Sequence, residues 1–233
     1  MDNIKLDVRV YPIDEPQGNT FAFASAAVGD LAAIRGIRVV NGRKGLFVTM
    51  PQSQDNSGVY HDIAFPLTGD LRKAVNESVL AEYARMSSID PQERGYADTE
   101  IGENDRISAE NIKLSVDVYP LNKPKGETLS FASVALDDLV AIRGIRVVKS
   151  ENGLSVSLPQ SKSGDGTSHD VAFPLSDDLR KEISRAVLAE HRALTAEKRQ
   201  SLEDRVNEGK QKAAQYTTKP KEMSKSHAQE VGD

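Results

Sequence analysis

The fold is decided by the stretch Ile34-Arg35-Gly36-Ile37-Arg38-Val39-Val40, which returns unchanged at residues 142–148. The similarity extends in both directions, so that residues 3–86 align with residues 111–194 at a constant offset of 108 and without a gap. More than half of the 84 aligned positions are identical. A repeat of this length indicates one structural unit present twice. The 233-residue chain is therefore predicted to contain two small domains instead of one large domain.

The predicted domain order is a first unit over residues 1–86, a linker over 87–110, a second unit over 111–194 and a charged tail over 195–233. The linker has seven acidic and two basic side chains, few apolar residues, and Pro and Gly as breakers. It therefore accounts for nearly all of the net charge of -5, and both units are close to neutral. The tail is predicted to begin as a polar helix and to be disordered from residue 215.

Most of each unit is predicted to be strands. From Ile4 to Val10 apolar residues alternate with charged ones, which is the period of a strand with one face in solvent. Further strands are predicted over residues 20–28, 31–40, 46–50 and 59–65. Gly36 lies between two isoleucines that strict alternation would place on opposite faces, so a β-bulge is expected there.

The last part of each unit is predicted to be an amphipathic helix, because the apolar period lengthens to 3.6 residues. The apolar stripes are Leu71, Val75, Val79, Tyr83 and Met86 in the first unit and Leu179, Ile183, Val187 and His191 in the second. Thr68 is the expected N-cap, and Asp70 lies in the first turn. The predicted fold class is α+β, with a five-stranded antiparallel sheet and a C-terminal helix in each unit. The two units are expected to pair through their strand edges as a pseudo-dimer.

Several classes of function are excluded by composition. The chain has no cysteine, and its four histidines lack clustered carboxylates, so neither disulfides nor a metal site is expected. Glycine-rich phosphate loops are missing, and no cofactor is predicted. No apolar run approaches the roughly 18 residues of a membrane span. We expect a cytoplasmic protein that does not bind a membrane.

Ser53, His61 and Asp62 have the residue types of a nucleophilic triad. However, Ser53 follows Pro51-Gln52 in a polar loop, without the glycine-framed elbow or the oxyanion donors of a hydrolase. We therefore expect no enzyme.

Basic pairs occur in the first turn of each predicted helix, namely Arg72 and Lys73 and their equivalents Arg180 and Lys181. The helix macrodipole disfavours cations at this end, so stability alone does not explain them, and contact with a phosphate is one interpretation. The alternative is that they are solvated charges or partners of Asp70 and Asp178.

Arginines also repeat on the central strand, at Arg35 and Arg38 and at Arg143 and Arg146. On an antiparallel sheet with one open face they would form a basic stripe that a nucleic-acid backbone can cross. The alternative is ion pairing with Asp7 or Asp30 across the sheet or at the interface between units.

Three motifs resemble the SpoVG family, the small septation and sporulation regulators of bacteria. They are IRVVNGRKGLFVTMPQS at residues 37–53, HDIAFPL at 61–67 and VLAEY at 79–83, and all three recur in the second unit. The resemblance covers each unit in full. It implies that each unit has a strand sheet and a C-terminal helix, and that the family's members are small homodimers that bind nucleic acid. A chain with two copies is then similar to a covalently linked version of that dimer.

Two departures from the family pattern concern charge. Where the family carries a basic pair in a loop, this chain has Gln54-Asp55 in the first unit and Lys162-Ser163 in the second. The family also tends to have arginine before the aspartate of the fifth strand and histidine before its proline, where this chain has His61 with Phe65 and His169 with Phe173. We predict a regulator that binds DNA or RNA, with the contacts made by Arg72, Lys73, Arg180, Lys181, Arg38, Arg146 and Lys162. The alternative is an adaptor that recruits a protein partner through the acidic linker and the tail.

Overall fold

The computed structural model describes residues 4–55, 57–94, 112–162 and 166–217. The first copy contains β1 (Leu6–Pro12), β2 (Thr20–Val28), β3 (Ala32–Gly42), β4 (Gly45–Thr49), β5 (Gln52–Gln54), β6 (Tyr60–Asp62), β7 (Ala64–Pro66) and α1 (Gly69–Ser87). The second copy contains β8 (Leu114–Lys125), β9 (Thr128–Leu136), β10 (Val140–Ser150), β11 (Gly153–Ser157), β12 (Gln160–Lys162), β13 (Ser168–Asp170), β14 (Ala172–Pro174) and α2 (Asp177–Thr217). All strand pairs are antiparallel, and a helix ends each copy, which confirms the predicted fold class.

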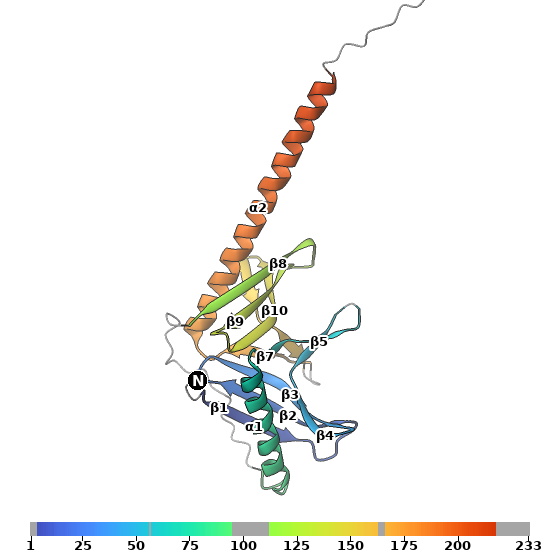
Figure 1. Cartoon of the computed structure of the whole chain (residues 1–233), viewed down its shortest axis with the longest axis vertical. Helices are drawn as coiled ribbons and strands as arrows, with labels where there is room; N and C mark the ends of the chain where they lie inside the picture. Colours follow the sequence, from blue (N-terminus) through green and yellow to red (C-terminus); the bar gives the residue numbers. More distant parts are fainter. Residues whose placement is uncertain (1–3, 56, 95–111, 163–165, 218–233) are drawn as a thin grey trace, which may run out of the picture. The chain divides into compact units, whose positions relative to one another are not determined.

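The core of the first copy lies between one face of its sheet and α1 (Figure 1). Val10, Ala24 and Ile37 face each other across β1, β2 and β3 and are buried. The helix contributes the stripe predicted from the sequence, with Leu71, Val75, Val79 and Met86 buried and Tyr83 partly exposed. Thr68 is the N-cap, and its hydroxyl accepts a hydrogen bond from the Leu71 N–H at 3.2 Å.

The predicted bulge at Gly36 is confirmed. Arg35 and Gly36 together stand opposite the single residue Ser25, because the pairing of β2 with β3 shifts between Ala24 and Ala26. Gly36 has φ of +74°, which glycine adopts without the steric cost that a Cβ would bring. The same shift occurs at Gly144, whose φ is +75°.

The two copies exchange a strand. β14 of the second copy pairs with β3 of the first, and β7 of the first copy pairs with β10 of the second. Each sheet therefore has five strands, four from its own copy and one from the other. The segment predicted as one strand over residues 59–65 is divided, since β6 pairs with β5 in a hairpin and only β7 crosses to the other sheet.

One residue in each copy makes the crossing. The Ile63 N–H donates to Pro51 O of its own copy at 2.8 Å, and the Ile63 carbonyl accepts from the Arg143 N–H of the other copy at 2.7 Å. Val171 repeats the arrangement with Pro159 and Arg35. The predicted pairing of the copies through strand edges is thus confirmed, in the form of a reciprocal exchange.

The exchanged strand is needed because β4 is too short to cover β3. β4 pairs only with Arg38–Gly42, which would leave the backbone groups of Ala32–Ile34 without a sheet partner on that side. β14 supplies that partner, and Ala32, Ala33 and Ile34 are fully buried. A buried backbone N–H or C=O without a hydrogen bond is costly, so the exchange completes both sheets.

The second copy contains a buried polar pair that the first copy lacks. Ser130 Oγ and His191 Nδ1 lie 2.7 Å apart, and both residues are buried between β9 and α2. Their equivalents in the first copy are Ala22 and Tyr83. Burial lowers the pKa of His191 below its ordinary value, and the nearby charge of Arg192 adds to this effect.

We expect this pair to make the stability pH-dependent. Because the folded-state pKa is lower than the unfolded one, the unfolded chain binds more protons, and the free energy of unfolding falls as the pH drops below about 6.5. Urea unfolding at pH 7.5 and pH 5.5 measures this loss. The double variant S130A/H191Y, which carries the pair of the first copy, should show a smaller loss, and an equal loss would contradict the prediction.

The predicted linker is partly ordered. Arg94 donates through Nε to Met86 O and Ile89 O at 3.1 and 3.2 Å, and it forms an ion pair with Asp14. Arg94 therefore ties the mostly exposed segment 87–94 to the first copy, and residues 95–110 of the predicted linker lie outside the described residues.

The described residues up to Arg192 form one compact unit, and those from Ala193 to Thr217 belong to a second. In the second unit α2 continues to Thr217, and the side chains from Ala196 to Lys212 are exposed. Residues 215–217, predicted to be disordered, are helical, and the rest of that prediction, over 218–233, lies outside the described residues. No helix in the described ranges is long and apolar enough to cross a membrane.

Candidate nucleic-acid interface

Each sheet has one face that its helix does not cover, here called the open face. In the first copy Tyr11, Phe23 and Arg38 form a row across β1, β2 and β3, because Tyr11 pairs with Phe23 and Phe23 pairs with Arg38. Residues paired across antiparallel strands point to the same face. Tyr11 is 40% exposed and Phe23 49% exposed, so the two rings lie on the open face and remain accessible.

The second copy repeats the row with Tyr119, Phe131 and Arg146. Tyr119 is 59% exposed and Phe131 43% exposed. Arg146 donates to Ser157 Oγ on β11 at 3.1 Å, which holds the guanidinium on this face. Each copy thus presents two aromatic rings and an arginine in the same order.

The strand exchange adds a second arginine to each open face. At the bulge of β3, Arg35 lies over the ring of Phe173 in β14, 4.6 Å from the ring centroid. Arg143 lies in the same way over Phe65, at 4.8 Å. These cation–π contacts join the two copies, because each ring receives an arginine from the other copy.

Arg72, at the start of α1, also reaches Phe65, at 5.6 Å from the ring centroid. The exchange of β7 therefore brings a helix-start arginine of the first copy and a strand arginine of the second copy to one ring. From the sequence, basic residues at the helix start and on the central strand are two separate hypotheses. The structure places one of each kind, Arg72 and Arg143, beside the same ring.

A groove of about 300 Å³ lies on the open face of the first copy. It is lined by Arg9, Tyr11, Phe23, Ala24, Ser25, Arg35 and Gly36. Arg9 is 4.0 Å from Asp7, so the carboxylate contact of its guanidinium is a weak one. In the second copy the position of Arg9 is taken by Asp117, which makes the two open faces unequal in charge.

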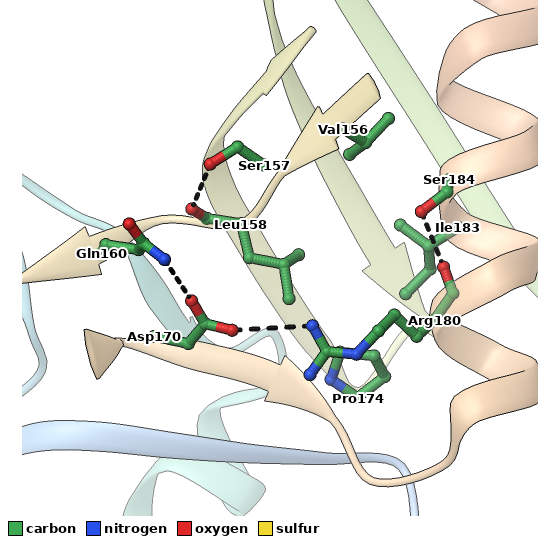
Figure 2. A pocket seen from close by; sticks show the side chains of 9 residues that line it. All are labelled: Val156, Ser157, Leu158, Gln160, Asp170, Pro174, Arg180, Ile183 and Ser184. Carbon is green, nitrogen blue, oxygen red and sulfur yellow. Dashed lines mark hydrogen bonds and ion pairs between the residues drawn. The ribbon is translucent and has the colours of Figure 1, made fainter. Parts of the chain in front are cut away.

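The helix-start arginines are held by the hairpin of their own copy. Asp62 accepts from Arg72 and from the Gln52 side-chain amide, both at 2.9 Å. In the second copy Asp170 accepts from Gln160 at 3.0 Å and lies 3.6 Å from Arg180 (Figure 2). These contacts border a cavity of about 280 Å³ between β11, β14 and the first turns of α2.

The remaining predicted contacts are exposed lysines. Lys73 lies 3.8 Å from Glu77, and Lys181 lies 3.4 Å from Asp178, which is the partner that the alternative interpretation named. Both ion pairs are exposed, and exposed ion pairs contribute little to the stability of a protein. Lys162 is exposed at the end of β12.

Two residues of the suggested triad are neighbours, since Ser53 pairs with His61 across β5 and β6, and the third, Asp62, is engaged elsewhere. His61 Nε2 lies 2.8 Å from Asp55 Oδ2, and Asp62 is engaged by Arg72 and Gln52. Asp55 also accepts from the backbone and hydroxyl of Ser57, and these hydrogen bonds, with the one from His61, hold its pKa well below the ordinary value. Asp55 therefore organises its own loop through these contacts.

Sequence reasoning missed the exposed aromatic residues. The sequence does contain the evidence for an exposed ring. Tyr11 continues the series Asp7 and Arg9, whose side chains the alternation of the first strand assigns to solvent. An aromatic residue at such a position, kept as Tyr119 in the other copy, marks an exposed ring.

Comparison with known proteins agrees with this architecture. The family model described as SpoVG matches residues 4–85 and again residues 112–193. A septation protein SpoVG 2 of Listeria monocytogenes is 38% identical over 104 residues, which cover 45% of this chain and 96% of that protein. A septation protein SpoVG of Anaeromyxobacter sp. strain K is 33% identical over 98 residues, covering 37% of this chain and 95% of that protein.

Proposed function

This chain belongs to the SpoVG family, and from that premise we propose that it is a non-catalytic regulatory protein that binds DNA or RNA. The names of its relatives associate the family with septation. The observation that carries the proposal is the repeated arginine on the open face of each sheet, Arg38 and Arg146, beside exposed aromatic rings. Nucleic-acid backbones are bound mainly by such cations, and bases by flat aromatic surfaces.

The two groups of predicted contacts have different surroundings. Arg72 and Arg180 are engaged by Asp62 and Asp170, so a phosphate would have to compete with a carboxylate at each helix start. Arg146 is held by a neutral hydroxyl, which leaves its charge uncompensated in that contact. We therefore assign the main phosphate contacts to the open faces and auxiliary contacts to Arg72, Lys73, Arg180, Lys181 and Lys162.

We expect binding to weaken steeply with salt, and the open-face arginines to account for part of that dependence. Each phosphate contact changes the slope of log K against log salt by about 0.7 for a single strand and about 0.9 for a duplex. Replacing both arginines in R38Q/R146Q should therefore reduce the slope by about 1.4 or about 1.8. Fluorescence anisotropy with labelled oligonucleotides, from about 50 to 300 mM salt, measures this change.

The matched control is R43Q/K44Q, which removes two exposed positive charges from the turn between β3 and β4. It should reduce the slope less than R38Q/R146Q does. If R72A/K73A/R180A/K181A alone flattens the slope, the contacts lie at the helix starts. If no oligonucleotide binds at micromolar protein in about 50 mM salt, the adaptor function becomes the better explanation.

A further inference from the structure

We propose that the open face of each sheet is a stacking platform for unpaired bases, so that the ligand is single-stranded nucleic acid. This inference rests on the proposed function and specifies both its ligand and its site. The platform is formed by Tyr11 and Phe23 in the first copy and by Tyr119 and Phe131 in the second.

The two rings of each platform lie side by side on the face away from the core. Tyr11 and Phe23 are directly opposite on neighbouring strands, so their side chains stand next to each other on one face. The core is on the other face, where Val10 and Ala24, the adjacent residues of the same strands, are buried. The rings therefore do not complete the core, and adjacent exposed aromatic residues indicate a binding surface.

The platform residues are the same in both copies although many other positions differ. Nearly half of the aligned positions differ, and Phe21, which precedes the platform on β2, is replaced by Leu129. Both platform rings are nevertheless identical in the two copies, and so is the arginine next to them. The unit therefore retains the combination of two rings and a cation.

Arginines surround the rings of the first platform. The groove beside Tyr11 and Phe23 is lined by Arg9 and Arg35, and Arg38 pairs with Phe23 across β2 and β3. Three guanidinium groups around two rings complement a ligand with flat apolar faces and regularly spaced negative charges. A nucleic-acid strand has both properties, whereas an apolar protein segment would gain nothing from the cations.

Exposed rings on the protein favour single strands over duplexes. In a duplex each base face is covered by its neighbours, so a ring on the protein can only stack on a base that is unpaired. The groove volume of about 300 Å³ lies at the lower limit of ligand pockets. A groove of this size can hold a single base but not a nucleic-acid duplex.

The two platforms are expected to differ in strength. Arg9 borders the platform of the first copy, and Asp117 takes its place in the second. Asp7 lies beside Arg9 in the first copy and offsets its charge, whereas the second copy has Ser115 and Asp117 at these positions and is more negative by one charge. Negative charge repels phosphate, so the first copy should bind more tightly. Exchanging the charges in R9D/D117R should reverse the order.

The experiment uses the full chain with a fluorescein-labelled single-stranded oligonucleotide of about 15 thymidines and a mixed-sequence duplex of the same length, near the upper site size of single-strand binding folds. The wild type should bind the single strand more tightly. The variant F23L/F131L should weaken that binding at least about fivefold, because stacking contributes about 5- to 150-fold per base. The salt slope should not change, since no cation is removed.

The matched control Y60S replaces an exposed tyrosine of the hairpin by the residue of the other copy, and it should bind as the wild type does.

The absence of tryptophan from the chain gives a second, direct measurement. The separate variants Phe23→Trp and Phe131→Trp each introduce a single fluorescent reporter on one platform. The single strand should quench both reporters, and the fluorescence of the Phe23→Trp variant should respond at a lower oligonucleotide concentration than that of the Phe131→Trp variant. Unchanged fluorescence, single-strand binding unaffected in F23L/F131L, or equal affinity for the duplex would overturn this inference and leave the proposed function intact. If the wild type bound neither the single strand nor the duplex, both this inference and the proposed function would be overturned.

Discussion

Ala172→Glu is expected to reduce the free energy of unfolding by at least about 3 kcal/mol, because it places an unpaired carboxylate in a dry interior. Ala172 is fully buried in β14 and pairs with Ile34 of β3, in the sheet of the other copy. Proteins of this size are stable by only about 5–15 kcal/mol, so the variant should lose much of its stability. Urea unfolding followed by circular dichroism measures the change.

The matched control is Ser168→Glu, which adds the same charge to the exposed strand β13 of the same copy. It should change the free energy of unfolding by less than about 0.5 kcal/mol. Ala64→Glu, at the equivalent position in β7, should be as damaging as Ala172→Glu, because Ala64 is fully buried against Ile142. If either exchanged strand tolerated the charge, that strand would not be part of a buried sheet.

Much of the fold could be predicted because local physics determines it. The alternation from Ile4 to Val10, the helical stripe from Leu71 and the bulge at Gly36 depend on spacing within one segment. The sheet that the fifth strand joins does not depend on spacing within one segment. Ala64-Phe65-Pro66 has the same pattern whether it pairs with its own β3 or with β10 of the other copy, so the strand exchange could not be read from the sequence.

The candidate site was predictable only in part for the same reason. Arg38 and Arg146 were assigned to an open face because strand alternation gives the face of each residue. The contact of Arg35 with Phe173 depends on the exchange, which joins residues far apart in sequence. The exposed rings were in phase with solvent positions, but aromatic residues are usually assigned to the core.

The excised first copy, residues 1–94, is expected to form a homodimer with twice the mass of the fragment. In the full chain, β3 and β10 each receive their last partner strand from the other copy. In the fragment only a second molecule can supply it, and β7 of each molecule would pair with the Ala32–Ile34 segment of the other. The melting temperature of the fragment should therefore rise with its concentration, because folding and association are coupled.

The full chain provides the comparison, since its linker holds both copies at a high effective concentration and the exchange is intramolecular. We expect the full chain to have the monomer mass of 25.4 kDa and a melting temperature independent of concentration. Light scattering and thermal scans over a wide range of concentration measure both properties. In the fragment, Ala64→Glu should abolish dimerisation and folding together, because a buried strand and a subunit interface are lost in one substitution. A folded monomeric fragment would show instead that β7 can close its own sheet, and that the exchange follows from the duplication and is not a requirement of the unit.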